Sequence, residues 1–260
     1  MTSTDATPVE LTATDLTVTY PSKSGQVNVL DKLTFEVPAG EIVSIVGPSG
    51  AGKTSLLRCL SGLMLPSAGR VEIDHLEIKE PPAGLGIVFQ DYGRSLFPWM
   101  DVRSNVELPL RSMGISRNER MGLVSSSLAE VGLESFEALY PWQLSGGMQQ
   151  RVAIARALAC RPKVLMMDEP FASVDAQTRF DLEDLVLKVH STHGMTVIVV
   201  THDIDESIYL AQRVVVLGGK PSTVREVIRV GLDFPREQIS TRGNPEFGNL
   251  RAQLFSALRR

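Results

Sequence analysis

One stretch of this chain has the residue types and the spacing needed to hold phosphate groups. The run Gly47-Pro48-Ser49-Gly50-Ala51-Gly52-Lys53-Thr54 matches the phosphate-loop pattern G-x-x-x-x-G-K-T at every position. Its glycines let the backbone curl so that several N–H groups point at bound phosphates. We expect Lys53 to reach the β- and γ-phosphates of a nucleotide and Thr54 to hold Mg²⁺. The alternative is a glycine-rich turn without a ligand.

Two adjacent carboxylates follow an apolar run later in the chain. Residues 164–167 predict a buried strand that places Asp168 at its carboxyl end, beside the phosphate loop. Asp168 could then bind Mg²⁺ directly or through water. Glu169 would accept a proton from the attacking water or orient it. Because neighbouring side chains of an extended chain point different ways, the two acids can divide these tasks. The alternative is a solvated acid pair at a strand end.

A third group of residues predicts a site shared between two chains. It lies within Leu144-Ser145-Gly146-Gly147-Met148-Gln149-Gln150-Arg151. Ser145 precedes a glycine pair and a predicted helix, so its hydroxyl and the nearby N–H groups could form a small anion site. The phosphate loop and the Ser145 region would lie on different subdomains and face the same way, so one chain could not use both on the same γ-phosphate. A head-to-tail pair of chains could, with one site from each chain. The alternative is a helix cap whose glycines permit close packing.

The hydrophobic pattern predicts the elements that position these groups. Period-two alternation and short apolar runs predict strands at residues 16–20, 33–37, 41–46, 86–89, 164–167, 196–200 and 213–217. Helices are expected at residues 54–63 and, from the spacing of apolar residues, around residues 182–189, with Asp175 as a candidate cap. Residues 21–25 are expected to form a turn or loop, and residues 250–258 a final helix in a less patterned tail. Strands that alternate with helices favour a mostly parallel sheet covered on both faces.

The middle third of the chain, residues 91–160, is predicted to be mainly helical. Ser116 and Glu119 have the spacing of a capping box, and Gly132 fits the end of that helix. We therefore expect an α/β fold: a P-loop NTPase core with a mostly parallel sheet, an N-terminal antiparallel β portion and an inserted helical subdomain. The predicted domain spans residues 9–232, with its core at about 9–90 and 161–232, its helical subdomain at about 91–160, and a C-terminal tail at 233–260.

Composition limits the expected partners and location. With 260 residues, 43% of them hydrophobic and 22% charged, the chain can form a globular protein with a sizeable core. Its net charge of −4 gives no support for nucleic acid as a partner. No apolar run reaches the roughly 20 residues that span a bilayer. The polar N-terminus does not resemble a signal peptide, and the two isolated cysteines fit a cytosolic protein.

The order and spacing of the motifs resemble those of the ATP-binding subunits of ABC transporters, from about residue 11 to residue 217. Residues 47–54 resemble the Walker A loop, residues 164–168 the Walker B strand, and residues 144–147 the signature motif. The resemblance implies an ATPase that binds ATP and Mg²⁺ and pairs with a second copy of itself. ATP would then lie between the phosphate loop of one chain and Ser145, Gly146 and Gly147 of the other.

The same resemblance implies roles for further residues. Gln90 resembles the Q-loop glutamine, expected at the metal and in catalysis, and Ser173-Val174-Asp175 resembles the D-loop. His202 resembles the switch histidine, which would contact the γ-phosphate and position Glu169 and the water. Tyr20 is similar to the aromatic residue that stacks on adenine, although an aromatic at a strand end can also serve packing alone.

Several stretches resemble the importer group for nitrate, sulfonate and taurine. They are Phe97-Pro98-Trp99-Met100, Pro141-Trp142-Gln143, residues 201–207, Pro235-Arg236 and Pro245-Glu246-Phe247. This implies a peripheral subunit on the cytoplasmic face of the cell membrane. It would drive a separate integral membrane permease and, indirectly, serve an extracytoplasmic solute-binding protein. Phe97, Pro98 and Trp99 could line a groove for a short permease helix or simply pack two subdomains together.

Two alternatives to a transporter subunit fit the sequence less well. A soluble ABC-type ATPase of DNA repair or translation would be expected to carry a long coiled-coil insertion or two cassettes, and the sequence contains neither. A P-loop kinase would have no use for residues 144–147. Met148 and Val174 replace the glutamine and alanine usual in the family, and we expect them to affect subunit contacts rather than the catalytic set.

Overall fold

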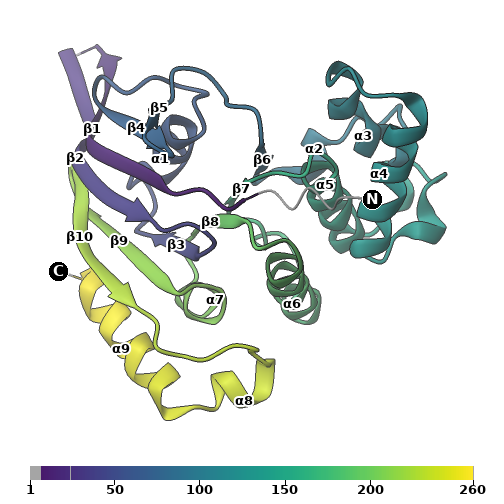
Figure 1. Ribbon diagram of the computed structural model, residues 1–260. Coiled ribbons are helices and arrows are strands. Elements are labelled where there is room, and N and C mark those ends of the chain that lie inside the picture. Colours follow the sequence, from purple (N-terminus) through teal and green to yellow (C-terminus); the bar gives the residue numbers. More distant parts are fainter. Residues whose placement is uncertain (1–6, 24, 260) are drawn as a thin grey trace.

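The computed structural model describes residues 7–23 and 25–259, except for the side chains of residues 92 and 94. Its framework is a curved sheet whose ten described strands run in the order β5-β4-β1-β2-β10-β9-β3-β8-β7-β6 (Figure 1). The strands are β1 Leu11–Ser22, β2 Gly25–Val37, β3 Ile42–Val46, β4 Ala68–Ile73, β5 Leu76–Glu77, β6 Leu85–Val88, β7 Val164–Asp168, β8 Thr196–Thr201, β9 Arg213–Gly219 and β10 Ser222–Arg229.

The middle of this sheet is parallel and buried. Strand β3 pairs in parallel with β8 and β9, and β7 pairs in parallel with β8 and β6. Every residue of β3, β7 and β8 is buried, which explains why these segments are continuous apolar runs rather than alternating patterns. Because the strands are parallel, the loops that leave β3, β7 and β8 emerge at the same edge of the sheet.

The predicted antiparallel portion is also present. Strand β1 pairs antiparallel with β2 and β4. Its pairing with β2 extends to Ser22 and Gly25, where the sequence predicted a loop; residue 24 lies outside the described residues. The sequence did not predict β4, β5 or β10. In β10 only Ser222 and Ile228 are buried, so its apolar pattern was too weak to indicate a strand.

The helices fall into two groups. A helical region between β6 and β7 contains α2 Tyr92–Ser95, α3 Val102–Glu107, η1 Leu108–Ser112, α4 Arg117–Glu130, η2 Glu134–Phe136, η3 Pro141–Gln143 and α5 Gly146–Ala159. The helices packed along the sheet and in the tail are α1 Lys53–Leu60, α6 Ala176–His193, α7 Ile204–Leu210, α8 Gln238–Arg242 and α9 Pro245–Arg259. Within the described ranges, no helix combines the length and apolarity needed to cross a membrane.

Local signals in the sequence account for several helix ends. The Ser116 hydroxyl accepts a hydrogen bond from the Glu119 N–H at 3.2 Å, so the predicted cap starts α4. Gly132 and Gly194 adopt left-handed conformations just after α4 and α6, where glycine avoids the strain of a side chain. The predicted α/β fold with its antiparallel portion and inserted helices is therefore confirmed.

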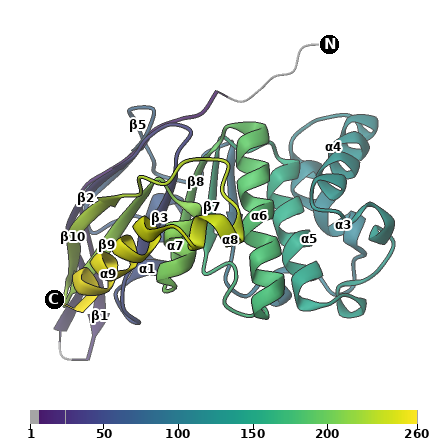
Figure 2. The ribbon, with the colours of Figure 1, turned by 90° about the horizontal axis from the view of Figure 1, so that it is seen from below.

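The tail is more ordered than its sequence pattern indicated. Helix α9 begins at Pro245, not near residue 250, and buries Phe247, Leu250 and Leu254. It packs against α7, β9 and β10, and Figure 2 shows it lying over β9 and β10, which are interior strands of the sheet. The tail therefore completes the hydrophobic core that α6 and α7 form with the sheet.

Candidate active site

The phosphate loop joins buried strand β3 to helix α1. Gly50 and Gly52 have φ values of 80° and 78°, which lie in the region that side chains disfavour. A Cβ at Gly52 would also lie 2.6 Å from Val29 Cγ1. Gly52 caps α1 without any side-chain hydrogen bond, so the first N–H groups of this helix remain available to an anion. Of the loop, Pro48, Ser49 and Gly50 are exposed, whereas Gly47 and Ala51 are buried.

Lysine and threonine of the loop make different contacts in the site. Lys53 is only 7% exposed, and its Nζ donates to the Gly47 carbonyl at 2.9 Å. The Thr54 hydroxyl donates to Asp168 Oδ2 at 3.1 Å. The hydrogen bond from Thr54 brings the ends of β3 and β7 together, as the sequence predicted.

The oxygen atoms around Asp168 suit a small hard cation. Asp168 Oδ1 is buried and has no hydrogen-bond partner within the part of the chain that is described. Burial raises the pKa of Asp168 above its usual value, and the nearby charge of Glu169 raises it further. A divalent cation would relieve both effects, with Asp168 and Thr54 as oxygen ligands. Among the described residues, no group of three or more His, Cys, Asp or Glu is placed to hold a metal ion by itself.

Three side chains converge on the Glu169 carboxylate. Lys53 Nζ lies 3.7 Å from Oε1, Gln90 Nε2 donates to Oε2 at 3.1 Å, and His202 Nδ1 lies 3.3 Å from Oε2. They come from α1, from the segment after β6 and from the segment after β8, which are far apart in the chain. The structure therefore assembles Glu169, Gln90 and His202 as one group, next to Asp168.

The backbone at Glu169 differs from the expectation. The sequence predicted Asp168 and Glu169 to be consecutive residues of an extended chain. Instead, Glu169 has a φ of 43°, and its N–H donates to the Val200 carbonyl at 2.7 Å. A left-handed conformation is unusual for a residue with a side chain and is concentrated at functional sites. The two carboxylates diverge because the backbone turns there.

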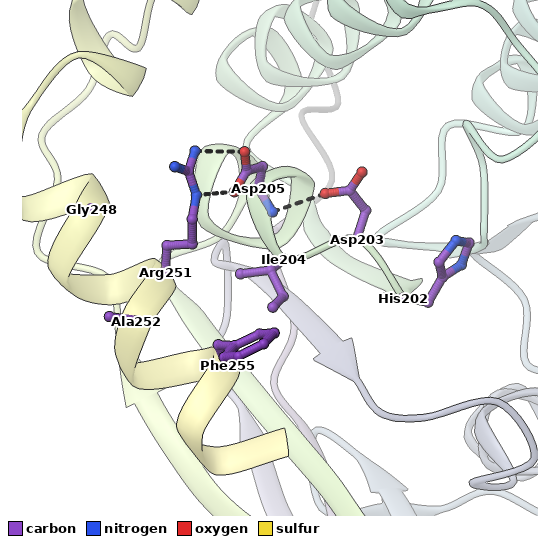
Figure 3. Close-up of a pocket in the computed structure, with 8 residues that line it drawn as sticks. All are labelled: His202, Asp203, Ile204, Asp205, Gly248, Arg251, Ala252 and Phe255. Atoms are coloured by element: carbon purple, nitrogen blue, oxygen red, sulfur yellow. Dashed lines mark hydrogen bonds and ion pairs between the residues drawn. The ribbon is translucent and has the colours of Figure 1, made fainter. Parts of the chain in front are cut away.

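The residue after His202, Asp203, holds the turn through hydrogen bonds and an ion pair. Asp203 caps α7: its Oδ1 accepts from the N–H groups of Asp205 and Glu206 at 2.9 and 3.1 Å. Its Oδ2 pairs with Arg179 of α6 at 2.9 Å. The His202 side chain is 58% exposed, and Figure 3 shows it at one end of a hollow of about 690 Å³ between α7 and α9. Arg179, Asp203 and Glu206 were not predicted, although Asp203 before a helix is a recognisable cap.

Two predicted site residues lie apart from this group. The Tyr20 hydroxyl is 3.0 Å from Ser55 Oγ and donates to Met64 Sδ at 3.3 Å, so the ring lies beside α1. The Ser145 hydroxyl caps α5 by accepting from the Met148 N–H at 3.3 Å. Helix α5 lies in the helical region, across the molecule from α1 (Figures 1 and 2). Gly146 is exposed, while a Cβ at Gly147 would overlap the Thr178 methyl group.

Known proteins match the chain closely. Residues 30–172 fit a family model described as ABC transporter. The nitrate import ATP-binding protein NrtD of Synechocystis sp. (strain PCC 6803 / Kazusa) is 41% identical over 256 residues, covering 96% of each chain. The taurine import ATP-binding protein TauB of Yersinia pestis bv. Antiqua is 43% identical over 205 residues, covering 79% of each. A dimeric structure of the ATP-binding cassette MJ0796 in a post-hydrolysis state, bound to ADP and Pi, is 33% identical with a TM-score of 0.75, covering 85% of this chain and 98% of that one.

The chain belongs to the ABC transporter family. The resemblance expected from its motifs, including the likeness to nitrate and taurine import subunits, is thereby confirmed. Its fold is that of an ABC ATPase cassette. As a member of this family, it is an ATP-binding protein whose ATPase activity is coupled to transport.

Proposed function

We propose that this ABC ATPase is the motor subunit of an importer for a small anionic or zwitterionic solute such as nitrate, a sulfonate or taurine. The observation that carries the catalytic part is the convergence of Lys53, Gln90 and His202 on Glu169, beside the Thr54–Asp168 pair. The solute class is supported by the printed functions of the relatives NrtD and TauB.

In the proposed hydrolysis step, Glu169 orients the attacking water and takes its proton. Lys53 and the N–H groups of residues 47–54 bind the phosphates. His202 and Gln90, already within hydrogen-bond reach of Glu169 or close to it, fix the carboxylate and shift to the γ-phosphate and the metal when ATP is bound. Thr54, Gln90 and Asp168 would hold Mg²⁺, which supplies positive charge against the charge that develops on the phosphates. Tyr20 would stack on adenine.

The position of α5 supports a site shared by two copies. Ser145, Gly146 and Gly147 start a 14-residue helix that lies in the helical region rather than beside α1. A second copy placed head-to-tail would present this helix start to the γ-phosphate of the first. Among similar structures, the cassette MJ0796 is a dimer.

An exposed apolar region beside Gln90 is the proposed contact with a membrane permease. A groove of about 480 Å³ is lined by residues of β6, η1 and α5, and by Phe89, which is 44% exposed. Trp99 is 69% exposed beside Phe97. Buried Asn105 holds this turn, since its side-chain amide donates to the carbonyls of Phe97, Met100 and Asp101 and its oxygen accepts from the Phe97 N–H. A rigid, exposed aromatic turn next to a groove suits a short helix of a partner.

In this arrangement the subunit lies at the cytoplasmic face of the membrane, and an extracytoplasmic protein delivers the solute to the permease. The decisive experiment has two parts. Glu169→Gln should reduce ATP turnover by about a hundredfold or more while ATP binding persists, and turnover at the wild-type rate would contradict the catalytic assignment. Co-purification of the permease, followed by uptake assays with nitrate, taurine and alkanesulfonates in a reconstituted complex, tests the solute; uptake of none of the three would refute the importer assignment.

A further inference from the structure

A small enclosed space lies behind the catalytic carboxylate. Its volume is about 40 Å³, and its lining includes Glu169, Arg179, Thr201, His202 and Glu206. A cavity needs roughly 10–15 Å³ measured in this way to hold one water molecule, together with two or more polar partners. The space is therefore large enough for a water molecule, and its lining is polar.

Two polar atoms in this lining lack partners. Glu206 Oε1 and Arg179 Nε are both buried, and neither has a hydrogen-bond partner among the residues that the structure describes. Glu206 is 4% exposed and Asp203 is already paired with the Arg179 Nη1 atom. An unpaired buried N–H and an unpaired buried carboxyl oxygen that border the same cavity are each costly, and one water molecule can satisfy both.

The charges around Glu206 favour its protonated form. It faces Asp203 from its own turn, Glu183 and Arg179 from α6, and the Thr201 hydroxyl from β8. Burial raises the pKa of Glu206 well above its usual value, and the charges of Asp203 and Glu183 raise it further, more than Thr201 and Arg179 lower it. Burial and these two charges therefore favour the protonated carboxyl, which can donate a hydrogen bond as well as accept one.

We propose that Glu206 and Arg179 hold a structural water molecule beneath Glu169, and that Glu206 acts through it as a positioning residue for the Glu169–His202 pair. Thr201 and Asp203, the residues on either side of His202, line the same cavity. The Thr201 hydroxyl faces the Glu206 carboxyl and accepts from the Asp203 N–H at 3.0 Å, so it lies between Glu206 and the turn that carries His202. Figure 3 shows Asp203 bonded to the first turn of α7, directly after His202.

The direct test is a high-resolution crystal structure of the full chain. We expect density for a water molecule within hydrogen-bond distance of both Glu206 Oε1 and Arg179 Nε. An empty cavity, or a direct hydrogen bond between these two atoms, would overturn the proposal. This test is independent of the catalytic assignment of Glu169, on which the positioning role rests, so the two can fail separately.

The kinetic test compares three variants by steady-state ATP hydrolysis across a range of pH. Glu206→Gln keeps a donor and an acceptor but cannot ionise, so it should retain kcat at neutral pH and keep it to higher pH than the wild type does. Glu206→Leu removes the water's partner and should lower kcat about tenfold to a hundredfold with little change in KM for ATP. The matched control is Glu183→Gln, because Glu183 is equally buried but does not line the cavity. Since the Glu183 charge raises the pKa of Glu206, this control should lose kcat at lower pH than the wild type, the opposite of Glu206→Gln.

Several results would refute the positioning role. They are wild-type kcat in Glu206→Leu, equal impairment in Glu206→Gln, or the same extension to high pH in Glu183→Gln. If Glu206→Leu does not fold, the pH profile of Glu206→Gln and the crystallographic water still decide the question.

Discussion

Arg236 fastens the tail to the helix that follows His202, and replacing it with methionine should destabilise the fold. The side chain is 6% exposed. Its Nη1 donates to the carbonyls of Ile208, Tyr209 and Ala211 at 2.8–3.0 Å, and its Nη2 donates to the Leu232 carbonyl at 3.0 Å. It therefore satisfies carbonyl groups at the end of α7 that the helix itself leaves unpaired.

The size of the effect follows from these contacts. A hydrogen bond with a charged partner contributes about 1.5–3 kcal/mol, and each buried carbonyl left unpaired costs about 1–3 kcal/mol. The four bonds share one side chain and are not additive, and the guanidinium has its own burial cost, which lowers the pKa of Arg236 to about 10. We therefore expect Arg236→Met to lower the free energy of unfolding by about 3–5 kcal/mol. Methionine retains most of the apolar volume, so the loss reports the hydrogen bonds.

Urea denaturation of the full chain, followed by circular dichroism, measures this loss. The matched control is Arg229→Met, since Arg229 is an exposed residue of β10 and its replacement should change stability by about 0.5 kcal/mol at most. If Arg236→Met matched that control, the tail would not hold α7 through Arg236. A change in the m value, the slope of the unfolding free energy against urea concentration, would instead indicate that the tail alone had detached.

Three further predictions concern the shared site, the aromatic turn and pH. Ser145→Arg should leave ATP binding by single chains intact but prevent ATP-dependent pairing of Glu169→Gln chains in gel filtration; pairing that persists would exclude the shared site. Asn105→Leu should remove four hydrogen bonds from the Phe97 turn. It should destabilise the chain by about 2–4 kcal/mol and weaken co-purification of the permease. Trp99→Ala should weaken co-purification of the permease without destabilising the chain. Glu206 binds its proton more tightly in the folded chain than in the unfolded chain. The wild type should therefore lose stability relative to Glu206→Gln as pH rises from 4.5 through the raised pKa, by at most about 1.4 kcal/mol per pH unit. A difference in urea denaturation that does not depend on pH would contradict this.

The sequence predicted the parts of this molecule whose causes are local. The phosphate loop, the Ser116 and Asp175 caps and the apolar strands β3, β7 and β8 each depend on neighbouring residues, and all are present. Strand β10 was missed because its pairing with β9, not its own apolar content, keeps it in the sheet. The left-handed turn at Glu169 was missed because it depends on a hydrogen bond to Val200, which is distant in the chain.

The same distinction applies to the candidate site. Motif order was enough to name Glu169, Gln90 and His202, but not the residues that support them. A charged residue on a helix, such as Arg179 or Glu206, normally predicts a solvated face. Glu206 and the Arg179 Nε atom are nevertheless buried, because α6 and α7 pack together, and no pattern within either helix could indicate that contact.

The tail helix and His202 are connected through one short helix. Helix α7 begins just after His202 and is capped by Asp203 at its start, while Arg236 satisfies carbonyls at its end. On its outer face, Asp205 forms a bidentate pair with Arg251 of α9 at 2.6 Å (Figure 3). That pair is exposed and contributes about 1 kcal/mol at most, so Arg236 provides most of the polar attachment. Replacing Arg236 should therefore change the position of His202 more than replacing Arg251 does. This holds even though Arg251 lines the hollow beside His202.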